Sequence, residues 1–533
     1  MTLQQAITKH QAGDLDGAER LYRGILAEEP AQADALHLLG LVHYARGDAA
    51  AAAALIRQAI GHAPDTAVYH FNLGNVCRDI GDAAAALAAY RAAVALAPDA
   101  ADHHNNLGTL HEALGDWTAA RDCYQRAVQL QPDDAELHAN LGNALRVLGE
   151  ADAAVASYRR AAELAPDASL LHQALADLHS ELDRPEAALP YYQRALELDP
   201  DNALLRVDLG ACLQRLGEAD AAAAHYRAAL ALQPDLAQAH NNLGALHQAR
   251  GELTQAAACY RAALAADPTL AEAHRNYASV LEAAGDTEAA LAHYEEALRL
   301  NPGDAAAAYQ RAALRGDAAP AAAPADYVAQ LFDQYADRFD AHLTDELGYR
   351  VPQLLRALCA SVGETCSDMQ VLDLGCGTGL SGLAFRDCAA HLAGVDLSPR
   401  MLDKARARGV YDALAVGDVV DALRARDAHW DLLVAADVFV YLGDLAAVLR
   451  AAARALRPGG RLLFSVERSD GDGFELRAAG RYAHSAGYVR ALAAAAGLRV
   501  DREQAAVLRR NFGADVHGLL FVLGKPSTSD QRA

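Results

Sequence analysis

The stretch "VLDLGCGTGLSGLAF", residues 371–385, places glycines at every second position directly behind a short apolar run. The apolar run has the length of a buried β-strand, and the glycines predict a turn before the next apolar segment. Glycine has no Cβ atom, so its backbone can pass close to a ligand. In an open α/β sheet, ligands bind at turns on the carboxyl ends of the strands. The stretch therefore predicts both a fold and a binding site.

Strand-like and helix-like segments alternate on the carboxyl side of this turn. Such alternation favours a doubly wound α/β sheet, mainly parallel, with helices between the first five strands. Seven strands are expected, at residues 370–374, 391–395, 412–416, 431–435, 461–466, 497–501 and 517–523.

The glycine spacing separates two classes of nucleotide-binding turn. A dinucleotide fingerprint, G-x-G-x-x-G, needs its third glycine at position 380, where this chain has Leu380. The observed spacing, Asp373-x-Gly375-x-Gly377-x-Gly379, resembles motif one of the class I S-adenosylmethionine-dependent methyltransferases. A dinucleotide needs a cradle for its pyrophosphate at a helix N-terminus, whereas adenosylmethionine has no phosphate. The resemblance therefore implies a Rossmann-like methyltransferase domain.

Four later segments support that resemblance, in order along the chain: "LAGVDLSPRML", "AVGDVVDAL", "DLLVAADVFVYLGDL" and "ARALRPGGRLLFSVE". It implies that Asp396 accepts hydrogen bonds from both ribose hydroxyls. It also implies that Asp418 and the amide of Val419 bind the adenine, and that Tyr335 closes over the cofactor. The expected adenosylmethionine-binding residues are Tyr335, Asp373, Gly375, Gly377, Gly379, Asp396, Leu397, Asp418, Val419 and Asp437.

The first three hundred residues repeat with a period of 34, most clearly in nine prolines from Pro30 to Pro302. Alanine, tyrosine and glycine columns keep the same step. Apolar spacing predicts two amphipathic helices in each unit, with Gly-Asp pairs such as Gly115-Asp116 between them. The pattern resembles the tetratricopeptide repeat. It predicts an all-α superhelix over residues 1–315, with nine repeats and a capping helix.

One polar column in the repeats has a candidate function. Long tetratricopeptide arrays, such as that of the O-linked N-acetylglucosamine transferase, use asparagines at this position to bind the backbone of an extended peptide. An amide suits this role because it offers both a donor and an acceptor. The alternative is a solubilising polar residue on the inner helix. The candidate groove residues are Asn72, Asn106, Asn140, Asn242 and Asn276.

A histidine column (His70, His104, His138, His172, His240 and His274) is expected to be structural. Equivalent side chains in successive repeats lie further apart than the roughly 8–10 Å between two packed helices. Zinc–nitrogen bonds are only about 2 Å long, so two such imidazoles cannot share one ion. No metal site is expected.

Composition limits the partners and the compartment. The 533 residues carry a formal charge of −23, which disfavours a nucleic-acid partner, although an acidic excess also simply favours solubility. Eight cysteines without a C-x-x-C pair, and no apolar run of signal or membrane-spanning length, predict a cytoplasmic protein without membrane segments. The remaining domain boundaries are expected at 316–325 for an alanine- and proline-rich linker, 326–525 for the methyltransferase domain and 526–533 for a polar tail.

The chain as a whole is similar to bacterial methyltransferases that carry tetratricopeptide repeats. The segments "LFDQYADRFDAHL", "DVFVYLGDL" and "GRYAHSAGYVRALAAAAGL" support this. The resemblance implies methyl transfer from S-adenosylmethionine and leaves the acceptor open. A carboxylate acceptor needs no general base, whereas an amine or hydroxyl needs one.

The candidate catalytic residues are Tyr482, His484 and Glu467, although Tyr482 and His484 could instead form a well-packed turn. Three functions remain open. In the first, the repeats capture a protein or peptide, and the catalytic domain methylates it or a neighbour. In the second, the repeats are an assembly scaffold for an enzyme that methylates a small molecule or glycan precursor. In the third, the chain is a binding protein with an inactive catalytic domain.

Overall fold

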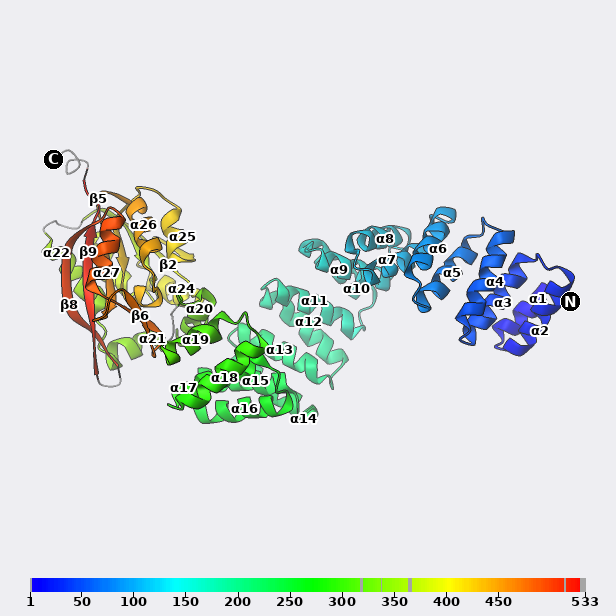
Figure 1. Cartoon of the computed structure of the whole chain (residues 1–533), viewed down its shortest axis with the longest axis horizontal. Helices are drawn as coiled ribbons and strands as arrows, with labels where there is room; N and C mark the ends of the chain where they lie inside the picture. The colour runs from blue at the N-terminus through cyan, green and yellow to red at the C-terminus, as the bar shows by residue number, and fades with distance from the viewer. Residues whose placement is uncertain (1, 317–319, 337, 363–366, 512–513, 528–533) are drawn as a thin grey trace. The chain divides into compact units, whose positions relative to one another are not determined.

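The computed structural model of the chain describes residues 2–316, 320–336, 338–362, 367–511 and 514–527 (Figure 1). The chain forms two compact units, Met1–Pro234 and Asp235–Ala533. The repeats continue across this division, and the domain boundaries expected at residues 315 and 326 stay predictions. Most of the expected polar tail, like Cys366, lies outside the described residues.

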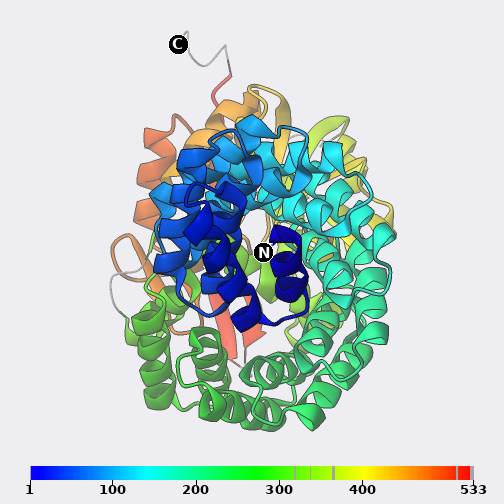
Figure 2. The same ribbon diagram turned by 90° about the vertical axis from the view of Figure 1, so that its right-hand side faces the viewer.

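The repeat region consists of nine helix pairs and one further helix. In Figure 2, the pairs of the first unit follow one another along a curved path. The helices are α1 (Leu3–Gln11), α2 (Leu15–Glu28), α3 (Ala33–Ala45), α4 (Ala49–His62), α5 (Ala67–Asp79), α6 (Ala83–Leu96), α7 (Ala101–Ala113), α8 (Trp117–Leu130), α9 (Ala135–Val147), α10 (Ala151–Leu164), α11 (Ser169–Glu181), α12 (Pro185–Leu198), α13 (Ala203–Arg215), α14 (Ala219–Leu232), α15 (Ala237–Ala249), α16 (Leu253–Ala266), α17 (Ala271–Ala283), α18 (Thr287–Leu300) and α19 (Ala305–Arg315).

In five of the repeats, a glycine of the first helix faces a tyrosine sixteen residues later in the second helix. A Cβ atom on Gly74 would lie 2.5 Å from the ring of Tyr90, and one on Gly108 would lie 2.8 Å from the ring of Tyr124. The missing side chain lets the tyrosine ring occupy the space between the two helices, where it is fully buried. The hydroxyl of Tyr90 donates to Asn75 Oδ1 at 2.7 Å, so the buried ring keeps a hydrogen-bond partner.

The turn inside several repeats has the expected Gly-Asp chemistry, whereas Glu150, Glu218 and Glu252 follow the glycine in three others without a side-chain cap. Gly115 has a φ of 78°, which ends α7, and the Asp116 side chain accepts from the Ala119 N–H at 3.1 Å at the start of α8. The same position in the sixth repeat is Asp183, which has a φ of 56°. Aspartate tolerates this left-handed conformation better than most residues do, so the repeat geometry is kept without glycine.

The described residues of the C-terminal α/β part form nine strands. Its helices and short turns are α20 (Ala325–Tyr335), α21 (Phe339–Ala341), η1 (His342–Glu346), α22 (Val351–Ser361), α23 (Leu380–Phe385), η2 (Arg386–Cys388), α24 (Pro399–Arg408), α25 (Val419–Arg424), η3 (Phe439–Tyr441), α26 (Ala446–Ala455) and α27 (Ala486–Ala495). Its strands are β1 (Met369–Leu374), β2 (Ala389–Asp396), β3 (Ala413–Val416), β4 (Trp430–Ala435), β5 (Leu456–Arg468), β6 (Phe474–Arg477), β7 (Arg481–His484), β8 (Arg499–Asn511) and β9 (Ala514–Gly524).

The sheet has the doubly wound topology that the strand–helix alternation predicts. Strands β3, β2, β1, β4 and β5 are parallel neighbours in that order, and β9 and β8 continue the sheet in antiparallel pairing. All seven expected strands are present. The hairpin β6–β7, which pairs with the end of β5, was not expected from the sequence.

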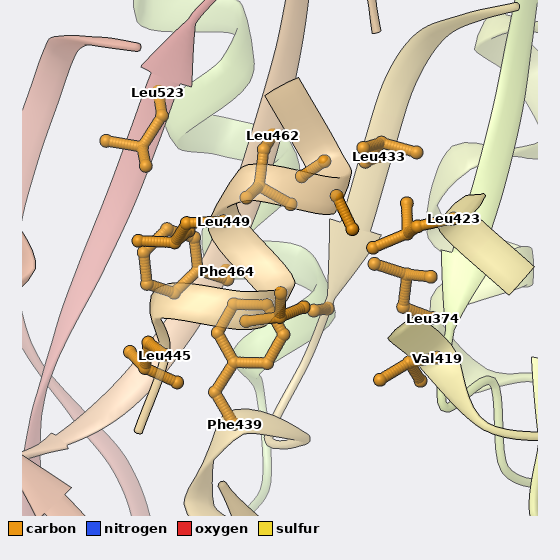
Figure 3. Packing of buried hydrophobic residues seen from close by; sticks show 14 of the residues in the cluster. Leu374, Val419, Leu423, Leu433, Phe439, Leu445, Leu449, Leu462, Phe464 and Leu523 are labelled. Atoms are coloured by element: carbon orange, nitrogen blue, oxygen red, sulfur yellow. The ribbon is translucent and has the colours of Figure 1, made fainter. Parts of the chain in front are cut away.

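Two hydrophobic layers enclose the sheet. Alternate residues of each strand point to opposite faces: Leu372 and Leu374 pack with α25, α26 and α27, whereas Val371 packs with α22 and α23. Figure 3 shows the first layer, in which Phe439 and Phe464 lie among leucines from β4, β5, α25 and α26. This packing holds the carboxyl ends of β1, β2 and β4 together at one edge of the sheet.

Replacing Gly74 by alanine should destabilise the repeats by about 1–2 kcal/mol, because the new methyl group overpacks the buried ring of Tyr90. Gly61→Ala is the matched control. It lies in α4 with nothing within 4 Å of a new Cβ, so helix propensity should stabilise it by up to about 1 kcal/mol. The measurement is the urea unfolding midpoint by circular dichroism. Equal midpoints for the two variants would contradict the packing role.

Candidate functional site

A cavity of about 460 Å³ opens at the carboxyl edge of the parallel strands. Its floor comes from the turn after β1, from the ends of β2 and β4, and from the start of α25. The helices α20 and α21 form its cover. Eight of the residues expected to bind adenosylmethionine line this cavity: Tyr335, Gly375, Gly377, Asp396, Leu397, Asp418, Val419 and Asp437. The structure therefore brings together residues spread over about a hundred positions of sequence.

The glycine turn needs its glycines for two different reasons. Gly375 has a φ of 64°, and a Cβ atom there would lie 2.6 Å from the Val438 side chain. Gly379, with a φ of 95°, is the residue before α23 and does not line the cavity. It lets the chain turn into that helix, whereas Gly375 lets β1 pass under the loop that follows β4.

Asp396 anchors the glycine turn to the end of β2. Its Oδ2 accepts from the Gly377 N–H at 2.8 Å and its Oδ1 accepts from the Ser398 N–H at 2.9 Å. Burial raises the pKa of Asp396, and the two backbone N–H groups oppose that rise. Each carboxylate oxygen keeps one lone pair that a ligand hydroxyl can use.

Asp373 lies behind the turn rather than in the cavity wall. It is 1% exposed, and its Oδ2 accepts from the Tyr411 hydroxyl at 2.6 Å. Its Oδ1 has no hydrogen-bond partner among the described residues. Burial, together with the negative charge of Asp396, raises the pKa of Asp373 to about 7. Asp373 therefore supports the glycine turn from beneath.

Asp418 has a structural role in addition to lining the cavity. Its Oδ1 accepts from the Val420 N–H at 2.7 Å and from the Asp421 N–H at 3.2 Å, which caps α25. Its neighbour Val419 starts that helix and also lines the cavity. The cap fixes the orientation of the Asp418 side chain and of the Val419 backbone at the cavity wall.

The cover is attached to the floor through two aspartates that the sequence did not reveal. The Ser398 hydroxyl donates to Asp333 at 2.5 Å, and the Thr378 hydroxyl donates to Asp340 at 2.5 Å. Arg408 also pairs with Asp340. Tyr335 lies between these anchors, with its ring 5.4 Å from that of Phe339. A heptad step between the two aspartates in "LFDQYADRFDAHL" is the sequence signal that could have found them.

The far end of the cavity carries a cluster of opposite charges. Arg509, 4% exposed, donates from Nη1 to both oxygens of Asp437 at 2.8 and 2.7 Å, and from Nη2 to Glu467. Asp437 has a φ of 62°, a strained conformation for a residue with a side chain. Arg481 and Tyr441 complete this end of the wall. Arg481 and Arg509 are charged residues at the site that sequence reasoning missed. Arg509 lies in no recognisable motif, and Arg481 lies in the segment "GRYAHSAGYVRALAAAAGL", where only Tyr482 and His484 were considered as candidates.

The three candidate catalytic residues lie behind the wall and are not among the described residues that line the cavity. The Tyr482 hydroxyl donates to the Pro320 carbonyl at 2.7 Å, and Glu467 pairs with Arg509. His484 Nε2 lies 2.8 Å from the Leu442 carbonyl and 3.1 Å from that of Gly443, so the proton is on this nitrogen. Burial lowers the pKa of His484 to about 4, so the ring is neutral near pH 7.

Part of the expected linker belongs to this site. The Ala321 carbonyl accepts from the N–H groups of Gly443 and Asp444, both at 2.8 Å, and the Ala323 N–H donates to the Tyr441 carbonyl at 2.9 Å. Ala322, Ala323 and Ala325 line the cavity. Alanine and proline without periodicity predict a spacer, and composition cannot reveal such backbone pairing.

The residues of the cavity fit adenosylmethionine better than a dinucleotide. The turn after β1 offers backbone without side chains, and Asp396 and Asp418 offer carboxylates to hydroxyl and amino groups. A pyrophosphate at this end would face those carboxylates, because the two arginines of the wall lie at the other end, beside Asp437. α23 has only six residues, which makes it a weak anion site.

The asparagine column forms hydrogen bonds between repeats. Asn106 Nδ2 donates to Asn75 Oδ1 at 3.0 Å, and Asn140 Nδ2 donates to Asn105 Oδ1 at 3.0 Å. Asn72 and Asn276 contact the preceding repeat in the same way, whereas Asn242 Oδ1 accepts from Gln238 of its own helix. All five side chains are half-buried. The amides link neighbouring repeats and still present an exposed part.

The histidine column has the structural role expected of it. The ring Nε2 atoms of His70, His104, His138, His172 and His274 lie 2.8–3.1 Å from the carbonyl of the proline six residues earlier. Each histidine therefore ties the first helix of a repeat to the preceding proline turn. In the described part of the chain, no cluster of side chains could hold a metal ion.

Comparison with known families agrees with both halves of the fold. The family model described as "Tetratricopeptide repeat" matches residues 3–67, 37–101, 71–133, 105–169, 174–237 and 241–305, and the model described as "Methyltransferase domain" matches residues 372–464. The repeat matches cover more than half of the chain. The chain belongs to the tetratricopeptide repeat family, and it carries a methyltransferase domain behind the repeats.

Curated relatives match the methyltransferase domain. Malonyl-[acyl-carrier protein] O-methyltransferase of Serratia marcescens is 33% identical over 141 residues, which are 26% of this chain and 52% of the relative. Ubiquinone biosynthesis O-methyltransferase of Xylella fastidiosa (strain 9a5c) is 34% identical over 104 residues, which are 19% of this chain and 42% of the relative. The chain thus spans about half of the length of these relatives.

Solved structures resemble the repeats. The MamA protein is 21% identical with a TM-score of 0.31, and the match covers 33% of this chain and 96% of that protein. PilW, a type IV pilus biogenesis factor, is 20% identical with a TM-score of 0.34, covering 38% and 94%. Among the described helices, none combines the length and apolarity needed to cross a bilayer.

Replacing Asp373 by asparagine should change how stability depends on pH. The raised pKa means that the folded parent loses stability as pH rises from about 4 to about 7, because the carboxyl ionises in the unfolded chain while burial keeps it protonated in the folded chain. Asparagine can still accept from Tyr411 but does not ionise. Relative to the parent, Asp373→Asn should therefore gain about 2 kcal/mol between pH 5 and pH 8.

The measurement is the urea unfolding midpoint of the parent and the variant at each pH. Asp403→Asn, on the exposed side of α24, is the matched control, and its difference from the parent should stay constant over this range. If the midpoints of the parent and of Asp373→Asn changed with pH in the same way, the raised pKa of the buried Asp373 carboxyl would be contradicted.

Proposed function

We propose that this chain is an S-adenosylmethionine-dependent methyltransferase. The observation that carries the proposal is the joint position of the glycine turn, Asp396 and Asp418 around one cavity. Asp396 would hold the ribose hydroxyls, and Asp418 with the Val419 amide would hold the adenine. When bound, adenosylmethionine supplies a methyl group already activated as a sulfonium.

The remaining residues of the cofactor set have supporting roles in this proposal. Asp373 and Gly379 shape the turn from behind, Gly375 and Gly377 leave room for the ligand, and Leu397 packs beside the ribose. Tyr335 closes the cover, which excludes water from the reacting groups. The chain's part in catalysis is to hold the acceptor in line with the methyl group and to keep the site dry.

We infer an oxygen atom as the methyl acceptor. Both groups of curated relatives described above are named O-methyltransferases, and the family model for the methyltransferase domain, over residues 372–464, spans the cavity residues from Gly375 to Asp437. An identity of about one third supports the reaction class but does not identify the acceptor molecule. The acceptor has to be inferred from the cavity itself, where Arg481 and Arg509 lie outside the glycine turn and the acidic segments that follow it.

We propose that the repeats bind a protein or peptide partner through the asparagine column. The half-exposed amides of Asn72, Asn106 and Asn140 in the first unit support this, because each keeps donors and an acceptor beyond its inter-repeat bond. The alternative is an assembly scaffold for an enzyme that methylates a small molecule or glycan precursor. The seven described cysteines are free, which favours the reducing cytoplasm.

Asp396→Ala should weaken binding of S-adenosylmethionine and S-adenosylhomocysteine at least tenfold, because the ribose loses a charged acceptor and the glycine turn loses its anchor. Asp421→Ala, an exposed carboxylate on α25, is the control and should bind as the parent does. Isothermal titration calorimetry measures both. Unchanged affinity in Asp396→Ala would remove the ribose ligand, and uptake of NAD instead would remove the proposed function.

The size of the methylated product separates the two roles of the repeats. Incubating the full chain and tritiated adenosylmethionine with a cell lysate should place the label in protein-sized material if the repeats present a partner for methylation. Size-exclusion chromatography of the labelled material gives the answer. Label confined to small molecules would contradict presentation by the repeats and support the scaffold alternative.

A further inference from the structure

Arg481 lines the cavity with its hydrogen-bonding capacity largely unused. It is the first residue of β7, its side chain is 27% exposed, and its buried Nη1 has no hydrogen-bond partner among the described residues. That atom lies 3.5 Å from Asp437 Oδ2 and 3.9 Å from Glu467 Oε1, which are ion-pair distances. A guanidinium carries five N–H donors, and leaving the donors of a buried nitrogen such as Nη1 unpaired is costly. Arg481 can therefore still donate hydrogen bonds to an anionic ligand.

The two carboxylates beside Arg481 are already satisfied by another arginine. Arg509 donates to both oxygens of Asp437 and to Glu467. Glu467 also pairs with Arg477 at 3.3 Å. Arg509 already donates hydrogen bonds to both carboxylates. Of the two arginines in the cavity wall, Arg481 is therefore the one with donors left for a ligand.

Among the described residues, Asp437 and Tyr349 lie near Arg481 and are already engaged in other contacts. Asp437 is held by Arg509, and the Tyr349 hydroxyl donates to the Ala436 carbonyl at 3.3 Å. Burial and the nearby charge of Asp437 raise the pKa of Tyr349 well above its usual value. The guanidinium of Arg481 lies 5.8 Å from the centre of the Tyr441 ring, a cation–π contact. A methyl acceptor that arrives at this end without a proton to lose fits these groups.

The cavity wall on the cover side is apolar. Val328, Leu331 and Phe332 of α20 line it, together with Leu343 and Leu347. An acceptor with a charged tip and an apolar stem would match this wall and Arg481 at once.

We propose that Arg481 binds the carboxylate of the methyl acceptor, which is a carboxylic acid on an apolar stem, and that the product is a methyl ester. This inference rests on the proposed methyl transfer and names the acceptor class for the same site. The carboxylic acid belongs either to a small molecule or to a protein, since both offer the same chemistry.

The transfer balances without a base. A carboxylate oxygen forms a bond to the methyl carbon while the carbon–sulfur bond breaks, and the electron pair of that bond stays on sulfur. The negative acceptor and the positive sulfonium become a neutral ester and a neutral thioether. A cavity screened from water favours a step that removes two opposite charges, because neither product requires solvation as an ion.

The hairpin that carries Arg481 is fixed by the last helix of the repeats. The Tyr309 hydroxyl of α19 donates to the Gly480 carbonyl at 2.9 Å, and Tyr482 packs against Tyr309 with ring centres 6.1 Å apart. Gly480 and Tyr482 flank Arg481 on both sides. The end of the repeat array therefore sets the position of the proposed carboxylate-binding residue.

The first test measures binding, independently of turnover. Hexanoate and hexan-1-ol are titrated by calorimetry into the full chain with and without S-adenosylhomocysteine. The parent should bind hexanoate more tightly than hexan-1-ol, and Arg481→Gln should lose at least tenfold of the hexanoate affinity. Arg481→Lys keeps a positive charge but lacks the planar guanidinium. Its hexanoate affinity should lie between that of the parent and that of Arg481→Gln. Arg490→Gln, an exposed arginine of α27 paired with Glu503, is the matched control and should match the parent.

Unfolding midpoints and S-adenosylhomocysteine affinity of each variant show that it has folded. Equal affinity of the parent for hexanoate and hexan-1-ol would overturn the proposal. So would a folded Arg481→Gln variant that binds hexanoate as the parent does. A parent that ignores adenosylmethionine and its demethylated product but still binds hexanoate through Arg481 would remove the methyltransferase assignment and leave the carboxylate site.

The second test identifies the bond that is formed. Methyl esters release volatile methanol in mild alkali, whereas N-, S- and ether-linked methyl groups do not. Label transferred from tritiated adenosylmethionine to a cell lysate should become volatile after alkali treatment. The Arg481→Gln variant should produce no such volatile label. Separating the labelled material by size before that treatment tells a protein carboxylate from a free acid. Label that survives alkali would overturn the proposal.

Discussion

Both parts of this protein are built around positions where a side chain is missing. In the repeats, glycines such as Gly74 leave a space that a tyrosine ring sixteen residues later fills completely. In the α/β part, Gly375 lets the turn after β1 pass beneath Val438, where a Cβ atom would lie 2.6 Å from that side chain. The tyrosine ring and the valine side chain are packed and cannot move aside for a new Cβ atom. These glycines therefore determine the spacing of the helices in one part and the shape of the cavity floor in the other.

Charge is arranged differently at the two ends of the cavity. At one end, Asp396 is held by backbone N–H groups, which keeps its carboxylate in place and leaves lone pairs for hydroxyl groups. At the other end, Arg509 neutralises Asp437 and Glu467, and Arg481 stands beside them without a hydrogen bond from its buried Nη1. An acceptor that enters as an anion and leaves as a neutral ester is consistent with this second arrangement.

Much of the fold, and the residues that line the end of the cavity near Asp396, could be predicted from local patterns. The period of 34, the strand "VLDL" and the acids that follow β2 and β3 lie close to their structural causes in sequence. The hairpin β6–β7 was missed because its two short strands follow one another without a helix between them, whereas β3, which is equally short, stands in the regular alternation of strands and helices. Tyr482 and His484 were candidates for catalysis, but they bond to backbone carbonyls of Pro320, Leu442 and Gly443, which no sequence pattern marks.

The sequence by itself determined the repeat architecture and the alternation of strands and helices in a mainly parallel sheet, because periodicity and turn chemistry act over a few residues. Only the tertiary structure decided which charged groups are satisfied. Arg509 and Asp437 are 72 positions apart, and Tyr309 and Gly480 are 171 apart. Whether an arginine in the cavity wall is paired or available depends on such long-range contacts, since its own neighbours in sequence do not provide the carboxylates that surround it.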